Sequence, residues 1–346
     1  MPPTATPARI LLIRPSAMGD VARSVPVLVA LRDAYPNARI DWLVQDTFAD
    51  VVRAHPALSR ALPFPRREFS RWATTGRWAS LVTYLRGFAR ERYDLVIDAQ
   101  GLARSGLIAR CTGAPRRIGH ADARELGWLG YTSRVPSDPE MHTVERMLSL
   151  VRSLGIPASA SPRTLRLFTP AEGSGFASSF PALAGRRYAV LAPTSRWVSK
   201  QWPDERFASL ARSLTAGGFA VAFVGAASER AQAPACTALA RENPDVIDLL
   251  GSTSVAQLMD VIEHAALVVG NDSAAVHIAV GFARPLVGLY GPTRLHRVGP
   301  CGRAPDALQH VRSSDRFEHK DPRTRVLMER ITLPEVVEAC RVRLGR

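Results

Sequence analysis

The stretch of residues 267–293 constrains the fold more than any other part of the chain. Its sequence is LVVGNDSAAVHIAVGFARPLVGLYGPT. The apolar run 267–269 has the length of a buried strand and is too short for a membrane span. Turn-forming residues follow it, then an Ala-rich helix over 274–283, an Arg-Pro pair that ends the helix, and a second buried strand over 286–290. The stretch therefore predicts strand, turn, helix and strand in a parallel sheet.

The turn inside this unit is a candidate anion site. In a parallel sheet it lies at the carboxyl end of its strand, where free helix N–H groups and the helix dipole favour a phosphate. Asp272 and Ser273 are also good helix N-caps. The alternative, that these residues only cap the helix, stays open from this stretch alone.

Length and composition narrow the class of protein. A chain of 346 residues favours two domains, and 46% hydrophobic with 22% charged residues is typical of soluble globular proteins. No signal peptide or membrane helix is recognisable, so we expect a cytoplasmic location. The 4 cysteines form no CxxC pair, which argues against a zinc site and a disulfide scaffold.

The charge is strongly positive, with 45 Lys and Arg against 31 Asp and Glu. Such a surface attracts nucleic acid, anionic membrane or a phosphorylated substrate. The alternative is a set of solvated arginines from an Arg-rich proteome. No helix-turn-helix, zinc-finger or RNA-binding aromatic signature accompanies the arginines, so nucleic acid is not expected as a partner.

Strand and helix signals alternate along the chain, which predicts an α/β fold with doubly wound, mostly parallel sheets. The predicted strands are 9–14, 40–44, 61–64, 95–98, 188–192, 219–224 and 246–249, before the two in 267–293. The predicted helices are 21–34, 47–54, 80–92, 102–110, 142–154, 204–216, 228–241, 255–265 and 333–344, and the last begins with the capping-box spacing Thr332 to Glu335.

A change of composition between 155 and 175 marks the domain boundary. We predict an N-terminal acceptor-binding domain over 1–165, a linker over 166–180 and a C-terminal nucleotide-sugar domain over 181–346, whose terminal helix could pack back on the first domain. Three segments are predicted without helices: an Arg-rich connection after residue 64, an extended stretch over 164–168, and a surface loop over 313–325.

The motif SAMGD, residues 16–20, follows the first strand. The carboxylate of Asp20 at this sheet edge suits a general base if a substrate hydroxyl comes within hydrogen-bond reach. The alternative is that Asp20 only caps the following helix. The motif is neither GxGxxG nor a P-loop, which disfavours a dinucleotide oxidoreductase and an NTPase.

A second candidate loop, PTSRWVSKQWPDERF, follows the first strand of the second half. Thr194 and Ser195 offer hydroxyls, and Arg196 and Lys200 offer positive charge to an anion. The alternative for Lys200 is a solvated surface lysine.

Taken together, SAMGD, the K-x-W-P segment and NDSAAVHIA followed by GLYGPT resemble glycosyltransferase family 9, the lipopolysaccharide heptosyltransferases, and most closely the heptosyltransferase I type. VIDAQGLARS and HTVER extend the resemblance nearly end to end. It implies a GT-B fold, with two Rossmann-like domains facing a cleft. It also implies heptose transfer, with inversion, from ADP-L-glycero-D-manno-heptose to an anionic Kdo-lipid A acceptor at the cytoplasmic face of the inner membrane. The resemblance further implies that no cofactor or metal is required.

The resemblance also assigns residues. Asp20 matches the catalytic base, and Lys200 matches the lysine that stabilises the leaving diphosphate. The acceptor-binding residues are expected to be Arg66, Arg67, Gln100, Arg104 and Arg117. The donor-binding residues are expected to be Ser16, Thr194, Ser195, Arg196, Glu229, Asp272, Ser273, Ala274, Ala275 and His277.

The chain departs from the family pattern at Ser273-Ala274, where the family usually has Thr-Gly. Two other functions therefore stay open. One is a same-family transferase for another nucleotide sugar or acceptor. The other is a nucleotide-sugar or polyanion-binding module without catalysis.

Overall fold

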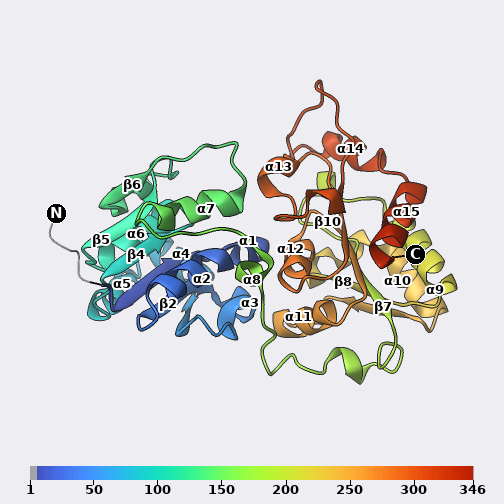
Figure 1. Ribbon diagram of the computed structural model, residues 1–346, viewed down its shortest axis with the longest axis horizontal. Helices are drawn as coiled ribbons and strands as arrows, with labels where there is room; N and C mark the ends of the chain where they lie inside the picture. The colour runs from blue at the N-terminus through green and yellow to red at the C-terminus, as the bar shows by residue number, and fades with distance from the viewer. Residues whose placement is uncertain (1–5, 346) are drawn as a thin grey trace. The chain divides into compact units, whose positions relative to one another are not determined.

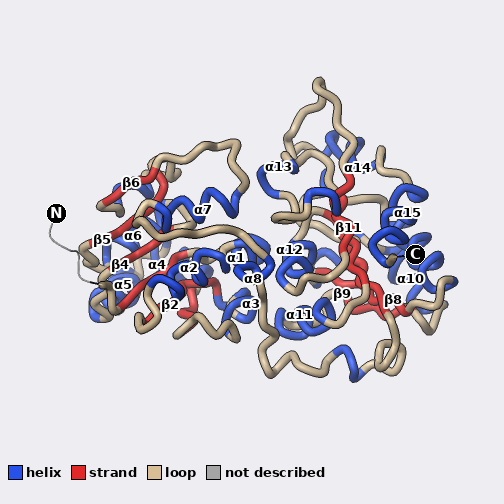
Figure 2. The backbone as a smooth tube through the Cα atoms, viewed as in Figure 1, coloured by secondary structure: helices blue, strands red, loops and turns tan. Residues whose placement is uncertain are grey.

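The computed structural model describes residues 6–345 and divides the chain into two compact units, Met1–Leu165 and Arg166–Arg346 (Figure 1). In each unit the strands lie together as a central sheet with helices packed around it (Figure 2). The two units repeat one plan, so the same sheet positions can be compared between them.

The first unit is built on a parallel sheet. Over residues 6–165 this sheet has six strands in the order β3-β2-β1-β4-β5-β6, and every neighbouring pair is parallel. The central strands are fully buried because helices cover both faces, as in other doubly wound sheets. The strands are β1 (Arg9–Ile13), β2 (Arg39–Gln45), β3 (Arg60–Phe64), β4 (Leu95–Asp98), β5 (Arg116–His120) and β6 (Ser133–Val135).

The helices of the first unit follow the strands in the expected alternation. They are α1 (Met18–Arg23), α2 (Val25–Ala34), α3 (Asp50–Arg53), α4 (Arg66–Thr74), α5 (Trp78–Arg90), α6 (Ala103–Cys111), α7 (Thr143–Arg152) and α8 (Pro162–Leu165), with 3-10 turns η1 (Asp46–Phe48) and η2 (Gly127–Gly130).

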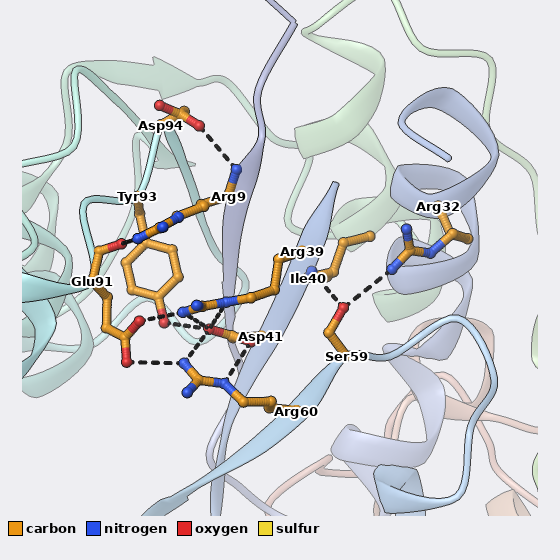
Figure 3. A network of polar contacts seen from close by, with 10 residues as sticks. All are labelled: Arg9, Arg32, Arg39, Ile40, Asp41, Ser59, Arg60, Glu91, Tyr93 and Asp94. Carbon is orange, nitrogen blue, oxygen red and sulfur yellow. Dashed lines mark hydrogen bonds and ion pairs between the residues drawn. The ribbon is translucent and has the colours of Figure 1, made fainter. Parts of the chain in front are cut away.

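The amino end of this sheet is closed by an ion-pair network (Figure 3). Asp41 is fully buried, accepts a hydrogen bond from the Tyr93 hydroxyl at 2.7 Å, and forms salt bridges with Arg39 and Arg60 at 2.9 and 2.7 Å. Glu91 pairs with the same two guanidiniums. Burial alone would raise the pKa of Asp41, but the hydrogen bonds from Arg60, Tyr93 and Arg39 hold it below its usual value. This network is structural and lies away from the strand ends that carry the motifs.

The second unit repeats the topology of the first. Over residues 166–345 its six strands have the order β12-β11-β10-β7-β8-β9, again all parallel. Counted within each unit, both sheets have the order 3-2-1-4-5-6, the dinucleotide-binding arrangement, with the chain reversal between the first and fourth strands. The strands are β7 (Tyr188–Ala192), β8 (Ala220–Gly225), β9 (Val246–Leu250), β10 (Leu267–Asn271), β11 (Leu286–Leu289) and β12 (Ala307–Leu308).

The terminal helix α15 (Leu333–Leu344) contributes Val336 and Cys340 to the core of the second unit, together with residues of α9 and β11. The other helices there are α9 (Asp204–Ala216), α10 (Pro234–Glu242), α11 (Val255–Glu263), α12 (Ala274–Gly281), α13 (Leu295–Val298) and α14 (Val326–Glu329). The 3-10 turns are η3 (Ala177–Ser179), η4 (Val198–Lys200), η5 (Ala227–Gln232), η6 (Ala304–Asp306) and η7 (Pro322–Arg325).

Several sequence predictions of local structure were wrong. The Arg-rich connection is a helix, α4, and the extended stretch over 164–168 begins inside α8. The single helix predicted over 21–34 is divided at Ser24, whose hydroxyl donates to the Asp20 carbonyl at 2.7 Å. The helix predicted over 228–241 is divided before Pro234, which has no N–H to continue the first turn. Strands β5, β6 and β12 were not predicted.

Candidate active site

Asp20 lies at the carboxyl end of β1, in the first turn of α1. The helix begins at Met18, so Asp20 is its third residue, and its carboxylate accepts the Ala17 N–H at 3.3 Å. Arg14 forms a salt bridge with the carboxylate at 3.0 Å, and Arg23 pairs with its other oxygen. The capping role is therefore present, but two guanidiniums also fix this carboxylate.

The electrostatics of this cluster keep Asp20 ionised. Burial favours the neutral acid, but the charges of Arg14 and Arg23 outweigh it and hold the pKa of Asp20 well below its usual range. The Asp20 side chain keeps 26% of its surface exposed, while those of Arg14 and Arg23 keep 11% and 10%. The carboxylate is thus the accessible member of the cluster and can accept a hydrogen bond from a bound hydroxyl.

Asp98, the last residue of β4, fastens the neighbouring loop. It is fully buried and accepts the N–H groups of Gln100 and Gly101 at 2.9 and 3.1 Å and the Tyr131 hydroxyl at 2.6 Å. Gln100 in turn accepts the Ser16 N–H at 3.2 Å. The loops after β1 and β4 are therefore linked, as the parallel register of these two strands allows.

A pocket at this edge brings together several predicted residues. Ser16, Arg66, Gln100 and Arg104 all line it. Ser16 was predicted to bind the donor, and here it lies with three residues that were predicted to bind the acceptor. The remaining lining residues are Pro15, Phe64, Leu102, Ser105 and Ile108.

Two predicted acceptor residues lie outside this pocket. Arg67 is exposed on α4 and is not among its lining residues. Arg117 lies near the amino end of β5, where its guanidinium donates to the carbonyls of Gly130, at 2.8 Å, and Ala114. Burial and the nearby Arg110 lower its pKa. Two of the five N–H donors of Arg117 are thus taken by backbone carbonyls, which hold the guanidinium near the amino end of β5.

In the second unit, β7 is followed by the loop over residues 193–202, which we call the lysine loop. Lys200 ends the short turn η4, and its ammonium lies 2.6 Å from the carboxylate of Asp272, which follows β10. The side chains are only 15% and 8% exposed. Burial would raise the pKa of Asp272, but the Lys200 charge holds it below its usual value. Lys200 is therefore a fixed, partly desolvated cation, and the surface-lysine alternative does not hold.

Asn271 fastens this loop to the sheet. It is fully buried at the end of β10, donates to the Pro193 carbonyl at 2.8 Å and accepts the Trp202 N–H at 3.0 Å. The buried Trp202 indole donates to the Ile331 carbonyl at 2.8 Å. Both ends of the loop that carries Lys200 are thus held by one amide side chain.

Thr194 and Glu229 form a second pair beside the lysine loop. The Thr194 hydroxyl donates to the Glu229 carboxylate at 2.9 Å. A Cβ atom at Gly225 would lie 2.4 Å from that hydroxyl oxygen, so only glycine leaves room for it. The neighbouring Ser195 N–H donates to Gln232 at 3.3 Å, while Arg196 is exposed and its guanidinium lies 5.2 Å from the Trp197 ring centroid.

The predicted donor turn leads into α12. Ser273 is the N-cap residue but makes no side-chain cap hydrogen bond, and its hydroxyl oxygen is buried without a partner in the described residues. Ala274 and Ala275 open the helix, and His277 is buried one turn further along. The first N–H groups of α12 are therefore not capped by Ser273, which suits an anion at the helix N-terminus.

The structure adds a residue that sequence reasoning missed. His319 lies in the segment predicted as a surface loop, yet its ring contacts the Trp197 ring edge-on with centroids 5.4 Å apart, and its carbonyl accepts the Ser199 hydroxyl. Burial and the nearby Lys200 charge lower the pKa of His319. No local motif signals this contact, because it joins residues about 120 positions apart along the chain.

Two features are absent from residues 6–345. No group of three or more His, Cys, Asp or Glu side chains in that range is arranged to hold a metal ion. Among the helices described there, none combines the length and apolarity that crossing a membrane requires.

Comparisons with known proteins show the family to which the chain belongs. The model of glycosyltransferase family 9 (heptosyltransferase) matches residues 82–326, well over half of the chain. Lipopolysaccharide heptosyltransferase 1 of Pseudomonas aeruginosa is 32% identical over 305 residues, which cover 86% of this chain and 82% of that protein. The resemblance inferred from the motifs is confirmed.

Solved structures agree on the fold. That of Escherichia coli ADP-heptose lipopolysaccharide heptosyltransferase II matches with a TM-score of 0.77 at 23% identity and covers 97% of this chain and 98% of that one. E. coli heptosyltransferase WaaC with ADP-2-deoxy-2-fluoro heptose matches with a TM-score of 0.68 at 26% identity over 83% of this chain and 90% of that one. With its two doubly wound units, this chain has the α/β GT-B fold, belongs to glycosyltransferase family 9 (heptosyltransferase), and is a glycosyltransferase.

Proposed function

We propose that this enzyme transfers heptose from ADP-L-glycero-D-manno-heptose to the Kdo-lipid A inner core of lipopolysaccharide, with inversion at the anomeric carbon. The observation that carries the proposal is the 32% identity to a lipopolysaccharide heptosyltransferase 1 over 86% of the chain. The match to WaaC, whose structure holds an ADP-heptose analogue, supports the donor class.

In this proposal the second unit binds the donor. The leaving diphosphate lies against Lys200 and the first N–H groups of α12, so that the negative charge that grows on it meets fixed positive charge. Lys200 must then exchange part of its contact with Asp272, at 2.6 Å, for the diphosphate. Asp272 keeps the lysine placed and charged before the donor arrives. Glu229, held by Thr194, can accept hydrogen bonds from hydroxyl groups of the donor through its other carboxylate oxygen.

The first unit binds the acceptor. Arg66 and Arg104, which line the pocket with Ser16 and Gln100, suit the carboxylate and phosphate groups of such an acceptor. The acceptor hydroxyl oxygen attacks the anomeric carbon, the bond from that carbon to the diphosphate oxygen breaks, and the hydroxyl proton passes to Asp20.

The low pKa of Asp20 has a mechanistic consequence. The carboxylate is ionised at neutral pH, but it is a weak base because Arg14 and Arg23 stabilise its charge. Proton transfer to Asp20 should therefore occur late, after the new bond to carbon has made the acceptor oxygen acidic. Arg14 and Arg23 then orient the base as well as keeping it charged.

The test is to incubate the protein with ADP-heptose and Kdo-lipid A and to follow product mass, ADP release and the anomeric configuration of the product. We expect one heptose added with inverted configuration. Turnover with a different nucleotide sugar alone would replace the heptose assignment by another family 9 activity. Tight ADP-heptose binding without any transfer would favour the non-catalytic module. The localisation proposed with this function is the cytoplasmic face of the inner membrane, as a peripheral protein.

A further inference from the structure

The helical hairpin formed by α4 and α5 exposes an unusual combination of side chains. Trp78 keeps 58% of its surface exposed and Val82 keeps 40%. Arg71, Arg77 and Arg86 are exposed in the same segment. We call these five residues the hairpin face.

The exposure of this face is imposed by packing on the other side of the hairpin. Phe69, Leu81 and Phe88 are buried against the first unit. Tyr84 joins the two helices, with its ring centroid 6.1 Å from that of Phe69 and 5.7 Å from that of Trp72. The hairpin is therefore held by an aromatic cluster, and Trp78 and Val82 are left outside it.

The charged residues of the hairpin are nearly all positive. Residues 66–90 contain six arginines and a single acidic residue, Glu68. Elsewhere in this unit, Arg39 and Arg60 are neutralised by Asp41 and Glu91. Within the described part of the chain, Arg71, Arg77 and Arg86 have no such carboxylate partner. Their charge is available to an anionic partner.

The spacing of the face favours a bilayer over a nucleic acid. Trp78, Val82 and Arg86 are separated by four residues each on α5, so they form one stripe along the helix. An indole and an aliphatic side chain beside arginines match the membrane interface, where apolar groups enter the acyl boundary and guanidiniums reach anionic headgroups. Binding to a nucleic acid would not explain an exposed valine in that stripe.

The hairpin also contributes a residue to the pocket proposed for the acceptor. Arg66, the first residue of α4, lines the pocket together with Ser16 and Gln100. A saccharide that contacts Arg66 while its lipid stays in the membrane needs the bilayer to lie close to α4. The hairpin supplies that surface within the same unit.

We propose that the hairpin face docks the enzyme on a bilayer that contains anionic phospholipids. The inference rests on the proposed function, because it assumes a lipid-linked acceptor. It names the surface that meets the lipid, with arginines supplying the electrostatic attraction and Trp78 and Val82 the apolar insertion.

The test measures flotation of the full chain with vesicles of phosphatidylcholine alone or with about 30% phosphatidylglycerol, at low and high salt. The wild type should float with the anionic vesicles and less so at high salt. The triple variant Arg71→Ala/Arg77→Ala/Arg86→Ala should bind about a hundredfold more weakly, from roughly fivefold per arginine, and lose most of the salt dependence. Trp78→Ala/Val82→Ala should bind more weakly but keep the salt dependence.

Matched controls come from the second unit, where Arg212→Ala/Arg241→Ala/Arg341→Ala removes the same charge and Val342→Ala removes an apolar side chain that is 55% exposed. These variants should float like the wild type. Equal losses in the controls, or undiminished flotation of the hairpin variants, would overturn the assignment. So would wild-type binding to RNA or DNA, but not to the vesicles, that is lost in the arginine variant.

A second readout separates this inference from the proposed function. The hairpin variants should transfer heptose to a water-soluble Kdo acceptor without lipid at the wild-type rate and fail selectively on acceptor embedded in vesicles. If the wild type transfers heptose to neither acceptor yet floats as described, the proposed function fails and the docking surface stands. If transfer occurs but the hairpin variants retain full activity on embedded acceptor, the docking surface fails alone.

Discussion

The carboxyl ends of β4 and β10 occupy the same place in the two units and carry different chemistry. Both strands end in a fully buried polar residue, Asp98 in the first unit and Asn271 in the second. Asp98 only accepts hydrogen bonds, from two backbone N–H groups and a hydroxyl. Asn271 both donates and accepts, and so spans the lysine loop from Pro193 to Trp202.

The loops that follow β1 and β7, the strands next to β4 and β10, also carry different charged groups. After β1, a carboxylate, Asp20, is surrounded by two arginines. After β7, an ammonium, Lys200, is paired with a carboxylate. One topology thus supports a carboxylate held by two arginines in one unit and an ammonium held by a carboxylate in the other. The fold determines where the site lies, and a few side chains at the strand ends determine what it can do.

The largest expected effect is at Asp20. Asp20→Asn should lower kcat by about two to four orders of magnitude, because the amide cannot take the proton. ADP affinity, measured by calorimetry, should stay unchanged, since the contacts proposed for the diphosphate, Lys200 and the first N–H groups of α12, lie in the second unit. Wild-type kcat in this variant would remove Asp20 as the base.

A folding control is needed, because loss of the carboxylate leaves Arg14 and Arg23, both mostly buried, without their counter-charge. Asp20→Glu keeps the charge and should retain the wild-type melting temperature more closely than Asp20→Asn. If Asp20→Glu folds well and is still strongly impaired, the defect lies in the position of the base and not in the stability of the unit.

Lys200 should show the next largest effect. Lys200→Ala should lower kcat by about two to three orders of magnitude and weaken ADP binding, because the diphosphate loses its cation. The double variant Lys200→Ala/Asp272→Asn should regain stability, since no unpaired carboxylate remains, but not activity. Recovery of kcat in the double variant would show that Lys200 acts only by neutralising Asp272.

Asn271→Ala should affect stability more than Asp98→Asn. The alanine leaves the Pro193 carbonyl and the Trp202 N–H unpaired in the core, which costs about 2–5 kcal/mol. Asn at position 98 can still accept both N–H groups, so the cost should be about 1–2 kcal/mol. Chemical denaturation of both variants measures the difference, and equal losses would break the comparison between the two strand ends.

The smallest effect is a difference in pH dependence. Burial raises the pKa of Asp98 despite its hydrogen bonds. Ionisation of Asp98 therefore destabilises the fold as the pH rises from the pKa of this group in the unfolded chain to its higher pKa in the folded chain. The pKa of Asp272 is lowered despite burial, because of Lys200, so it stabilises the fold above its unfolded pKa and this contribution is lost as the pH falls through the folded value. From pH 3 to 7, the melting temperature of Asp98→Asn should therefore rise relative to that of the wild type, and the melting temperature of Asp272→Asn should fall relative to it.

The sequence predicted the framework of the fold well where the local signals were strong. The capping box at Thr332 and Glu335 set α15 at 333–344, as observed. The apolar runs at β1, β4, β7 and β10 are legible because buried parallel strands are nearly continuous in hydrophobic residues. Strand β5, RRIGH, was missed since it begins with two arginines, and α4 was missed because arginines outnumber its few core residues.

The candidate site could be predicted only residue by residue. Asp20, Lys200 and Asp272 were predicted from the motifs, but the pairing of Lys200 with Asp272 depends on β7 and β10 being neighbours in the sheet. Lys200 and Asp272 are 72 positions apart along the chain. Arg14 as a partner of Asp20, and His319 beside Trp197, depend on side-chain packing that no spacing rule contains.

The hydrogen bond from the Trp202 indole to the Ile331 carbonyl makes the position of the lysine loop depend on the C-terminal segment. Ile331 immediately precedes the N-cap of the terminal helix, so the loop that carries Lys200 is tied through the Trp202 ring to the C-terminal segment. Truncation before Ile331 should therefore displace the loop that carries Lys200 and, because α15 also supplies Val336 and Cys340 to the core, lower the melting temperature of the second unit.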